Sequence, residues 1–90
     1  MKVKVSNLTS PRSWREVPNQ FEIRIDGKRY FQSYDSVIAV IDENWKITLD
    51  ERYWNYSMTT SKYRNQFLGL TTEETKRRIK SGEIALADLN

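Results

Sequence analysis

The stretch FEIRIDGKRYF, residues 21–31, carries the clearest structural signal in the chain. Apolar Phe21, Ile23 and Ile25 alternate with charged residues, which is the period of a strand that has one apolar face. The Asp26-Gly27 pair that follows suits a two-residue hairpin turn, in which both residues adopt positive φ. The stretch therefore predicts a β-hairpin, whose second strand starts directly after the glycine.

A second hairpin is predicted over residues 36–50, SVIAVIDENWKITLD. The continuous apolar run 37–41 is typical of a central strand that is covered on both faces. A helix is the alternative for this run, but its β-branched side chains favour a strand. The connection 42–44 places Asn44 where a left-handed residue is needed, and alternation resumes over residues 45–49.

The first twenty residues predict one short strand and one long loop. Residues 2–5, KVKV, alternate polar and apolar side chains as a strand does. Residues 6–20 contain two prolines and many turn-forming residues, so we expect a loop there. Long loops in small domains are often functional or mobile, which makes this segment a candidate site.

Residues 57–81 predict two helices. A residue of the run 59–61 can cap the first helix, and Gly69 is expected just past its end. Tyr63 and Phe67 are four residues apart, so they would form one apolar stripe on that helix.

The second helix has clear signals at both ends. Thr71 and Glu74 have the spacing of a capping box at its start, and Gly82 is expected to close it. Residues 82–90 are expected to form a short tail that contains apolar side chains.

These elements together predict a single α+β domain over residues 1–90. We expect a small antiparallel sheet of about three to five strands, with both C-terminal helices packed on one face. The expected core consists of Phe21, Ile23, Ile25, Val37, Ile38, Val40, Ile41, Trp45, Ile47, Leu49, Phe67 and Ile79.

The composition narrows the classes of function. The 90 residues carry a net charge of +3 and contain no cysteine and no histidine. Disulfides, Cys-His and Ser-His-Asp nucleophilic sites and most zinc sites are therefore excluded. Scattered carboxylates could hold Mg²⁺, but predicted turns explain Asp26, Asp42 and Glu43 better. We expect a non-enzymatic protein without metal or cofactor, and keep a metal-dependent nuclease as the alternative.

Basic, amide and aromatic side chains supply the candidate residues for binding a partner or a nucleic acid. Tryptophan and arginine dominate the hot spots of protein interfaces, although a loop tryptophan can equally cover the sheet. The candidates are Arg12, Trp14 and Arg15 in the loop, Lys62, Arg64 and Asn65 on the first helix, and Lys76, Arg77, Arg78 and Lys80 on the second.

The basic run 76–80 has two interpretations. Four cations within two helical turns could bind phosphates, and the two helices could then form a DNA-reading helix-turn-helix. The structural alternative is that cations favour the C-terminal end of a helix, while Glu73 and Glu74 favour its start. This alternative explains the order of the charges without a ligand.

Two segments, FQSYDSVIAVID and YWNYSMTTSKYRNQFLG, carry a resemblance to a known group. Ser33-Tyr34, Ile38-Ala39 and the helix start 56–61 resemble the pattern of a family of small uncharacterised proteins encoded by phages and plasmids of low-GC Gram-positive bacteria. The resemblance implies a mobile-element origin and a location in the cytoplasm of the bacterial host. The lack of a secretion signal and of a long apolar run leads to the same expectation, with no membrane partner.

The expected function is that of a non-enzymatic accessory protein that binds a host protein or nucleoprotein. An anti-defence inhibitor, similar in role to anti-CRISPR proteins, is the specific form that the resemblance suggests. The alternative is a DNA- or RNA-binding accessory or regulatory protein that uses the basic second helix. The sequence leaves the oligomeric state open.

Overall fold

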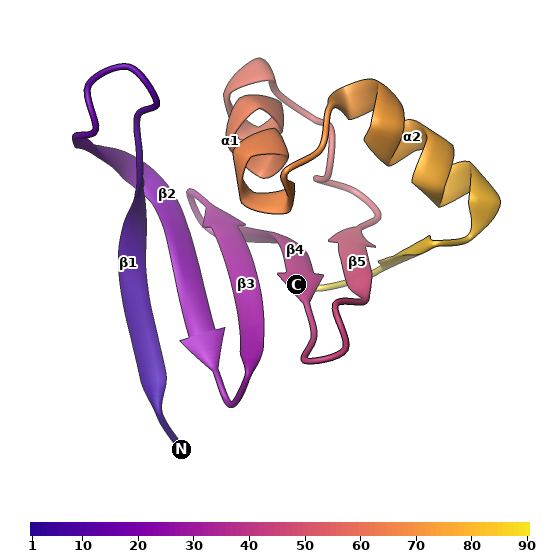
Figure 1. Cartoon of the computed structure of the whole chain (residues 1–90), viewed down its shortest axis with the longest axis horizontal. Coiled ribbons are helices and arrows are strands. Elements are labelled where there is room, and N and C mark those ends of the chain that lie inside the picture. Colours follow the sequence, from indigo (N-terminus) through magenta and orange to yellow (C-terminus); the bar gives the residue numbers. More distant parts are fainter.

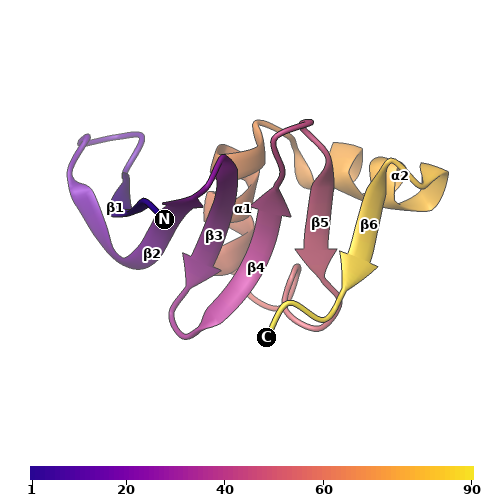
Figure 2. The same ribbon diagram turned by 90° about the horizontal axis from the view of Figure 1, so that it is seen from below.

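The computed structural model describes all 90 residues and has the α+β fold that the sequence predicts. The six strands form one sheet in which their spatial order is their order along the chain, and two helices cover one of its faces (Figure 1). Figure 2 shows both helices behind the sheet and no element in front of it. The elements are β1 (Val3–Thr9), β2 (Glu16–Ile25), β3 (Lys28–Ser33), β4 (Ser36–Ile41), β5 (Ile47–Asp50), α1 (Met58–Leu68), α2 (Thr72–Ser81) and β6 (Ile84–Ala87).

The last strand was not expected. β1 to β5 pair antiparallel with their neighbours, whereas β6 returns after the two helices and pairs parallel with β5. The predicted tail 82–90 is therefore wrong in its first half, because Ile84–Ala87 is the sixth strand of the sheet. Four residues with two exposed side chains carry too short a pattern to distinguish a strand from a tail.

The predicted loop 6–20 is also wrong in large part. β1 continues to Thr9 and β2 begins at Glu16, so only residues 10–15 form the connecting turn. The pairing of the two strands shifts register between Asn7 and Thr9. Pro18 lies opposite this irregularity, where no ladder hydrogen bond from its nitrogen is required. A local irregularity therefore allows a strand through a segment whose composition favours a loop.

The β2–β3 hairpin turn has the predicted backbone conformation, and the β4–β5 hairpin turn differs from the prediction. Asp26 and Gly27 have φ values of 48° and 86°, as the Asp-Gly turn predicts. In the β4–β5 turn the left-handed residue is Trp45, with φ 64°, and not Asn44. The Asp42 carboxylate holds this turn by accepting the N–H groups of Asn44 and Lys46, both at 2.9 Å. Trp45 is thereby exposed and is not a core residue.

The helix ends follow capping chemistry. The N-cap of α1 is Ser57, whose hydroxyl accepts the Thr60 N–H at 3.1 Å, so the expected cap within 59–61 is wrong. Thr60 is buried and shares a hydrogen bond of 2.8 Å with Ser33 of β3. Gly69 ends α1 as predicted, with φ 71°. The capping box of α2 and its terminal Gly82 are both confirmed.

The core lies between the sheet and the helices. The rings of Phe31 on β3 and Phe67 on α1 stack with centroids 5.7 Å apart. Ile47 and Ile79 are partly buried and pack against this core, and Ile38, Ile41, Leu49 and Phe67 are buried within it, as predicted. The remaining buried apolar residues are Tyr63, which the predicted stripe of the first helix includes, and Phe31, Ala39 and Ile84, which the predicted core omitted.

The alternation in β2 is correct, but the apolar side of the strand faces away from the helices. Glu22 lies opposite Phe31, and Phe31 contacts Phe67, so Glu22 belongs to the helix-covered face. Its neighbours along β2 therefore point to the other face of the sheet. Five predicted core residues are therefore only half-buried, because they lie on the uncovered face. They are Phe21, Ile23, Ile25, Val37 and Val40.

Candidate partner-binding surfaces

The turn between β1 and β2, residues 10–15, carries an exposed tryptophan between arginines. Trp14 is 79% exposed, and Arg12 and Arg15 are exposed without an ion-pair partner within 4.0 Å. The Trp14 N–H donates to the Ser10 carbonyl at 2.9 Å, and the Ser10 N–H donates to the Arg15 carbonyl at 2.8 Å. The turn, which we call the Trp14 turn, therefore presents its side chains on an internally bonded backbone.

Trp14 has an unfavourable backbone conformation for a large residue. Its φ of 60° lies in the left-handed region, which bulky side chains seldom adopt. Such strain persists where the surrounding structure imposes it, often at functional positions. Of the two alternatives for Trp14, the one in which it covers the sheet is wrong, because the side chain is exposed.

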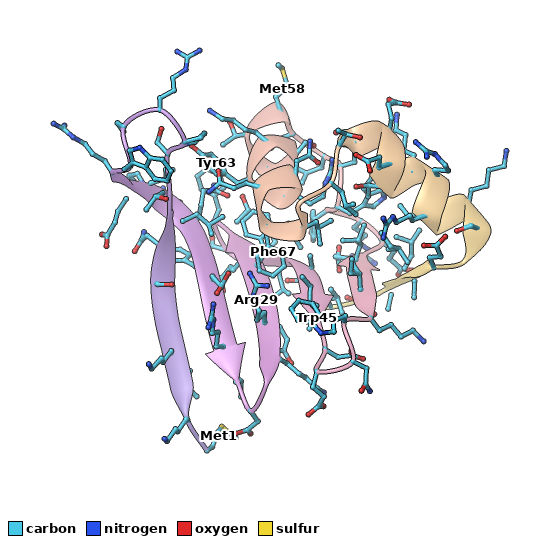
Figure 3. All side chains as sticks on the ribbon, in the orientation of Figure 1. Met1, Arg29, Trp45, Met58, Tyr63 and Phe67 are labelled. Carbon is cyan, nitrogen blue, oxygen red and sulfur yellow. The ribbon has the colours of Figure 1, made fainter.

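Further exposed apolar side chains lie at the same end of the molecule. Alternate turns of an antiparallel sheet share one end, so the β3–β4 turn with exposed Tyr34 lies at the end of the Trp14 turn. The Tyr34 N–H donates to the Asn19 carbonyl of β2 at 2.7 Å. Met58, which is 91% exposed, is at the start of α1 at this end (Figure 3). The end thus combines aromatic, apolar and cationic groups.

An open hollow of about 390 Å³ lies at the start of α1. Its lining consists of Asn55, Tyr56, Ser57, Met58 and Ser61. No acidic or basic side chain contributes to this lining, so it offers hydrogen-bonding groups and apolar surface. A hollow of this character suits a side chain of a protein partner better than a charged small ligand.

Arg64 is not a surface residue, contrary to the prediction. It is completely buried, and its guanidinium donates to the Trp54 carbonyl and to Asn55 Oδ1 at 3.1 Å. It also donates to Asn65 Oδ1 and Thr72 Oγ1, each at 2.9 Å. These bonds connect the segment before α1 with the start of α2, so Arg64 holds the two helices together.

The charge of Arg64 has no carboxylate partner. The guanidinium carbon lies 5.1 Å from the centre of the Trp54 ring, and all its hydrogen-bond acceptors are neutral. Burial lowers the pKa of Arg64 from its ordinary value. Asn65 is half-buried and engaged in the same network through Thr72. Neither residue is available to a partner, and of the α1 candidates only Lys62 remains exposed, 5.3 Å from the Tyr63 ring.

The basic side chains of α2 divide into free and engaged groups. Lys76, Arg77 and Lys80 are exposed and form no ion pair within 4.0 Å. Arg78 is half-buried, and its Nη1 lies 4.0 Å from Glu83 Oε2. At the other end of the helix, the N–H of Thr71 lowers the pKa of Glu74, with its hydroxyl contact and the nearby arginines adding to the effect. The charge order fits the helix dipole, and three cations remain accessible.

The two buried carboxylates, Asp50 and Glu22, have structural contacts. Burial raises the pKa of Asp50, but hydrogen bonds from the Leu89 and Tyr53 N–H groups, the Asn90 amide and the Arg52 N–H bring it below its ordinary value. For Glu22, burial is likewise outweighed by Arg29 and Arg24, whose guanidinium groups lie 2.8 and 2.7 Å away and lower its pKa. No three acidic side chains gather as metal ligands do.

Comparison with known proteins gives a family and no close relative of known role. A family model of unknown function, DUF8033, matches residues 3–83. No curated protein and no solved structure matches the chain. None of the helices has the length and apolar character needed to cross a membrane. Because the family model spans nearly the whole chain, the protein belongs to the family of unknown function DUF8033.

Proposed function

We propose that the protein is a non-enzymatic accessory protein of a phage or plasmid, which binds a host protein or nucleoprotein as an anti-defence inhibitor. The observation that carries this proposal is the Trp14 turn, where a strained tryptophan is 79% exposed between two arginines. Burial of the exposed Trp14 ring by a partner would remove its apolar surface from water and so offset the strain of its backbone. Tryptophan and arginine are the residue types that contribute most when an interface forms.

The surroundings of the Trp14 turn support the same proposal. Tyr34, Tyr56 and Met58 add exposed apolar surface on the adjacent turn and at the start of α1. A standard interface needs roughly 800 Å² from each partner. One end of a molecule that measures 35 × 32 × 20 Å, extended over the neighbouring helix, can supply this area.

The test is affinity capture from a lysate of a low-GC Gram-positive host, with Trp14→Ala as the variant. Trp45→Ala is the matched control, because Trp45 is 77% exposed, also has a positive φ, and lies in a turn at the opposite end of the sheet. We expect the wild type and the Trp45 variant to retain the same specific host polypeptide, and the Trp14 variant to lose it. Equal loss with both variants, or no specific polypeptide on the wild type, would refute the proposal.

A second candidate function is nucleic-acid binding by α2, which the three unpaired cations Lys76, Arg77 and Lys80 favour. Each phosphate contact releases counterions, so the affinity for a generic duplex should fall steeply with salt. The double variant Arg77→Glu with Lys80→Glu should abolish binding, whereas the double variant Lys4→Glu with Lys28→Glu, on the exposed positions of β1 and β3, is the charge-matched control. Absence of duplex or single-strand binding at ~50 mM salt would eliminate this candidate.

A further inference from the structure

The uncovered face of the sheet carries one continuous ladder of side chains across all six strands. Directly opposed residues in neighbouring strands share a face, so the pairing register defines the ladder. Phe31 faces the helices, and its neighbour Tyr30 therefore points to the uncovered face of the sheet. The ladder that contains Tyr30 lies on that face. The members in strand order are Val5, Ile23, Tyr30, Val40, Thr48 and Ala85.

This ladder is apolar yet remains accessible. Ile23, Tyr30 and Val40 are only half-buried, and Val5 is 62% exposed. Figure 2 shows no helix across this side of the sheet, and the C-terminal segment after β6 follows its lower edge, where Asn90 bonds to Val37 and Asp50. The covered face instead accommodates the polar side chains of Gln20 and Glu22. The more apolar side of β2 is thus the side that the fold leaves uncovered, and a partner is required to bury it.

The chemistry of the ladder favours a second copy of this chain. None of its six members is charged, so it offers nothing to a phosphate or to an acidic partner. A two-fold axis places each residue near its own copy, which a charged ladder would oppose by repulsion. Homodimer interfaces are also more apolar and poorer in charge than other interfaces.

The size of the face is adequate for a stable dimer. Six strands at ~4.8 Å spacing extend across about 29 Å, within a molecule that measures 35 × 32 × 20 Å. A stable interface needs roughly 800 Å² per partner, which a face of this width can provide. Val3 and Ile25 flank the central ladder on one side, in a row that ends at the exposed Lys28, and Phe21 and Val37 flank it on the other side.

We infer that two copies of the protein pack through their uncovered sheet faces into a two-fold symmetric dimer. The two sheets would lie ~10 Å apart with their strands at about 30°, as in aligned sheet packing. Both Trp14 turns remain outside the interface, because they extend beyond the end of the sheet (Figure 1). The dimer therefore carries two copies of the proposed binding turn, but it does not depend on the function of that turn.

The test is sedimentation equilibrium over a range of concentrations, with circular dichroism to verify folding. The wild type should approach twice the chain mass of 10.7 kDa. Tyr30→Lys, at the middle of the ladder, should weaken dimerisation by about 100-fold or more, because a charge would be buried without a partner. Val5→Lys, at its exposed edge, should weaken dimerisation about tenfold, with little effect on the fold of the single chain.

Met58→Lys is the matched control, since Met58 is 91% exposed and lies on α1, away from this face. It should leave the dimer unchanged. A wild type that stays monomeric at its highest soluble concentration would overturn the inference. So would a dimer that persists in folded Tyr30→Lys and Val5→Lys. If the Tyr30 variant fails to fold, the Val5 variant decides the question.

Discussion

The two faces of the sheet differ, and on β2 they reverse the usual relation between burial and polarity. The helix-covered face buries Gln20, Glu22 and Ser33 beside the aromatic stack of Phe31 and Phe67. The uncovered face presents valines, isoleucines and a tyrosine to solvent. Alternation in a strand therefore separates two sets of side chains, but the position of the helices decides which set is buried.

The largest expected loss of stability comes from a comparison of one phenylalanine on the helix-covered side with one on the uncovered face. Phe67→Ala should reduce the free energy of unfolding by about 3–5 kcal/mol, because the ring is buried and stacks on Phe31. Phe21→Ala, on the uncovered face, removes the same ring from a half-buried position and should cost about 1 kcal/mol. Urea unfolding measures both. A loss below ~1 kcal/mol for Phe67→Ala would mean that α1 does not pack as described.

Arg64→Lys tests whether the buried polar network stabilises the covered side. A lysine cannot reach the acceptors on Trp54, Asn65 and Thr72 together, so we expect a loss of about 2–3 kcal/mol. Lys62→Arg changes charge geometry at a neighbouring exposed position and should have little effect. Equal urea midpoints for Arg64→Lys and the wild type would contradict the structural role of the guanidinium.

Asp50→Asn tests how much the buried carboxylate at the end of β5, next to the core residue Leu49, stabilises the fold. Its folded-state pKa is lowered, so its contribution is fully present above the ordinary aspartate pKa and is lost as pH falls through the lowered value. Asp50→Asn should cost about 1–2 kcal/mol at neutral pH, and should flatten the acid limb of the stability curve. Thermal melts from neutral to acidic pH measure this. An unchanged acid limb would show that other carboxylates control it.

Trp14→Ala should have the smallest effect on folding, within about 0.5 kcal/mol, since the exposed side chain contacts no part of the core. A small gain in stability would fit release of the left-handed strain. Loss of partner capture without loss of thermal stability would separate binding from folding. A decrease above ~2 kcal/mol would instead assign the residue to the fold.

Much of the local chemistry was predictable from the sequence, and the long-range arrangement was not. The Asp26-Gly27 turn, the capping box at Thr71 and Glu74 and the terminal Gly69 depend on neighbours within four residues, and all are confirmed. In each case the residue types themselves indicate the backbone conformation or the capping hydrogen bond that the position needs. The fold class follows from these elements, because two hairpins and two helices have few ways to pack.

Most of the errors share one cause, namely dependence on contacts outside the local segment. The exceptions are the cap at Ser57 and the left-handed Trp45, where neighbouring residues could fill the same role. Arg64 lies next to Tyr63 and outside the predicted apolar stripe of the helix, so its position on the helix does not predict burial. It is buried because Trp54 and Thr72, from outside α1, accept its hydrogen bonds. β6 becomes a strand only because β5 provides an edge for it. Of the candidate binding residues, those in exposed turns or on the solvent side of α2 remain accessible, since no other element packs over them.

The parallel pairing of β5 and β6 has a consequence for how the chain folds during synthesis. Ile47 pairs with Ile84, so both helices must be made before the sheet can acquire its sixth strand. The Leu89 N–H and the Asn90 amide then bond to Asp50, and Asn90 also bonds to the Val37 carbonyl. The four antiparallel pairings form between neighbours, but completion waits for residues near 90 to leave the ribosome. The nascent chain therefore leaves the β5 edge unpaired until Ile84–Ala87 has left the ribosome.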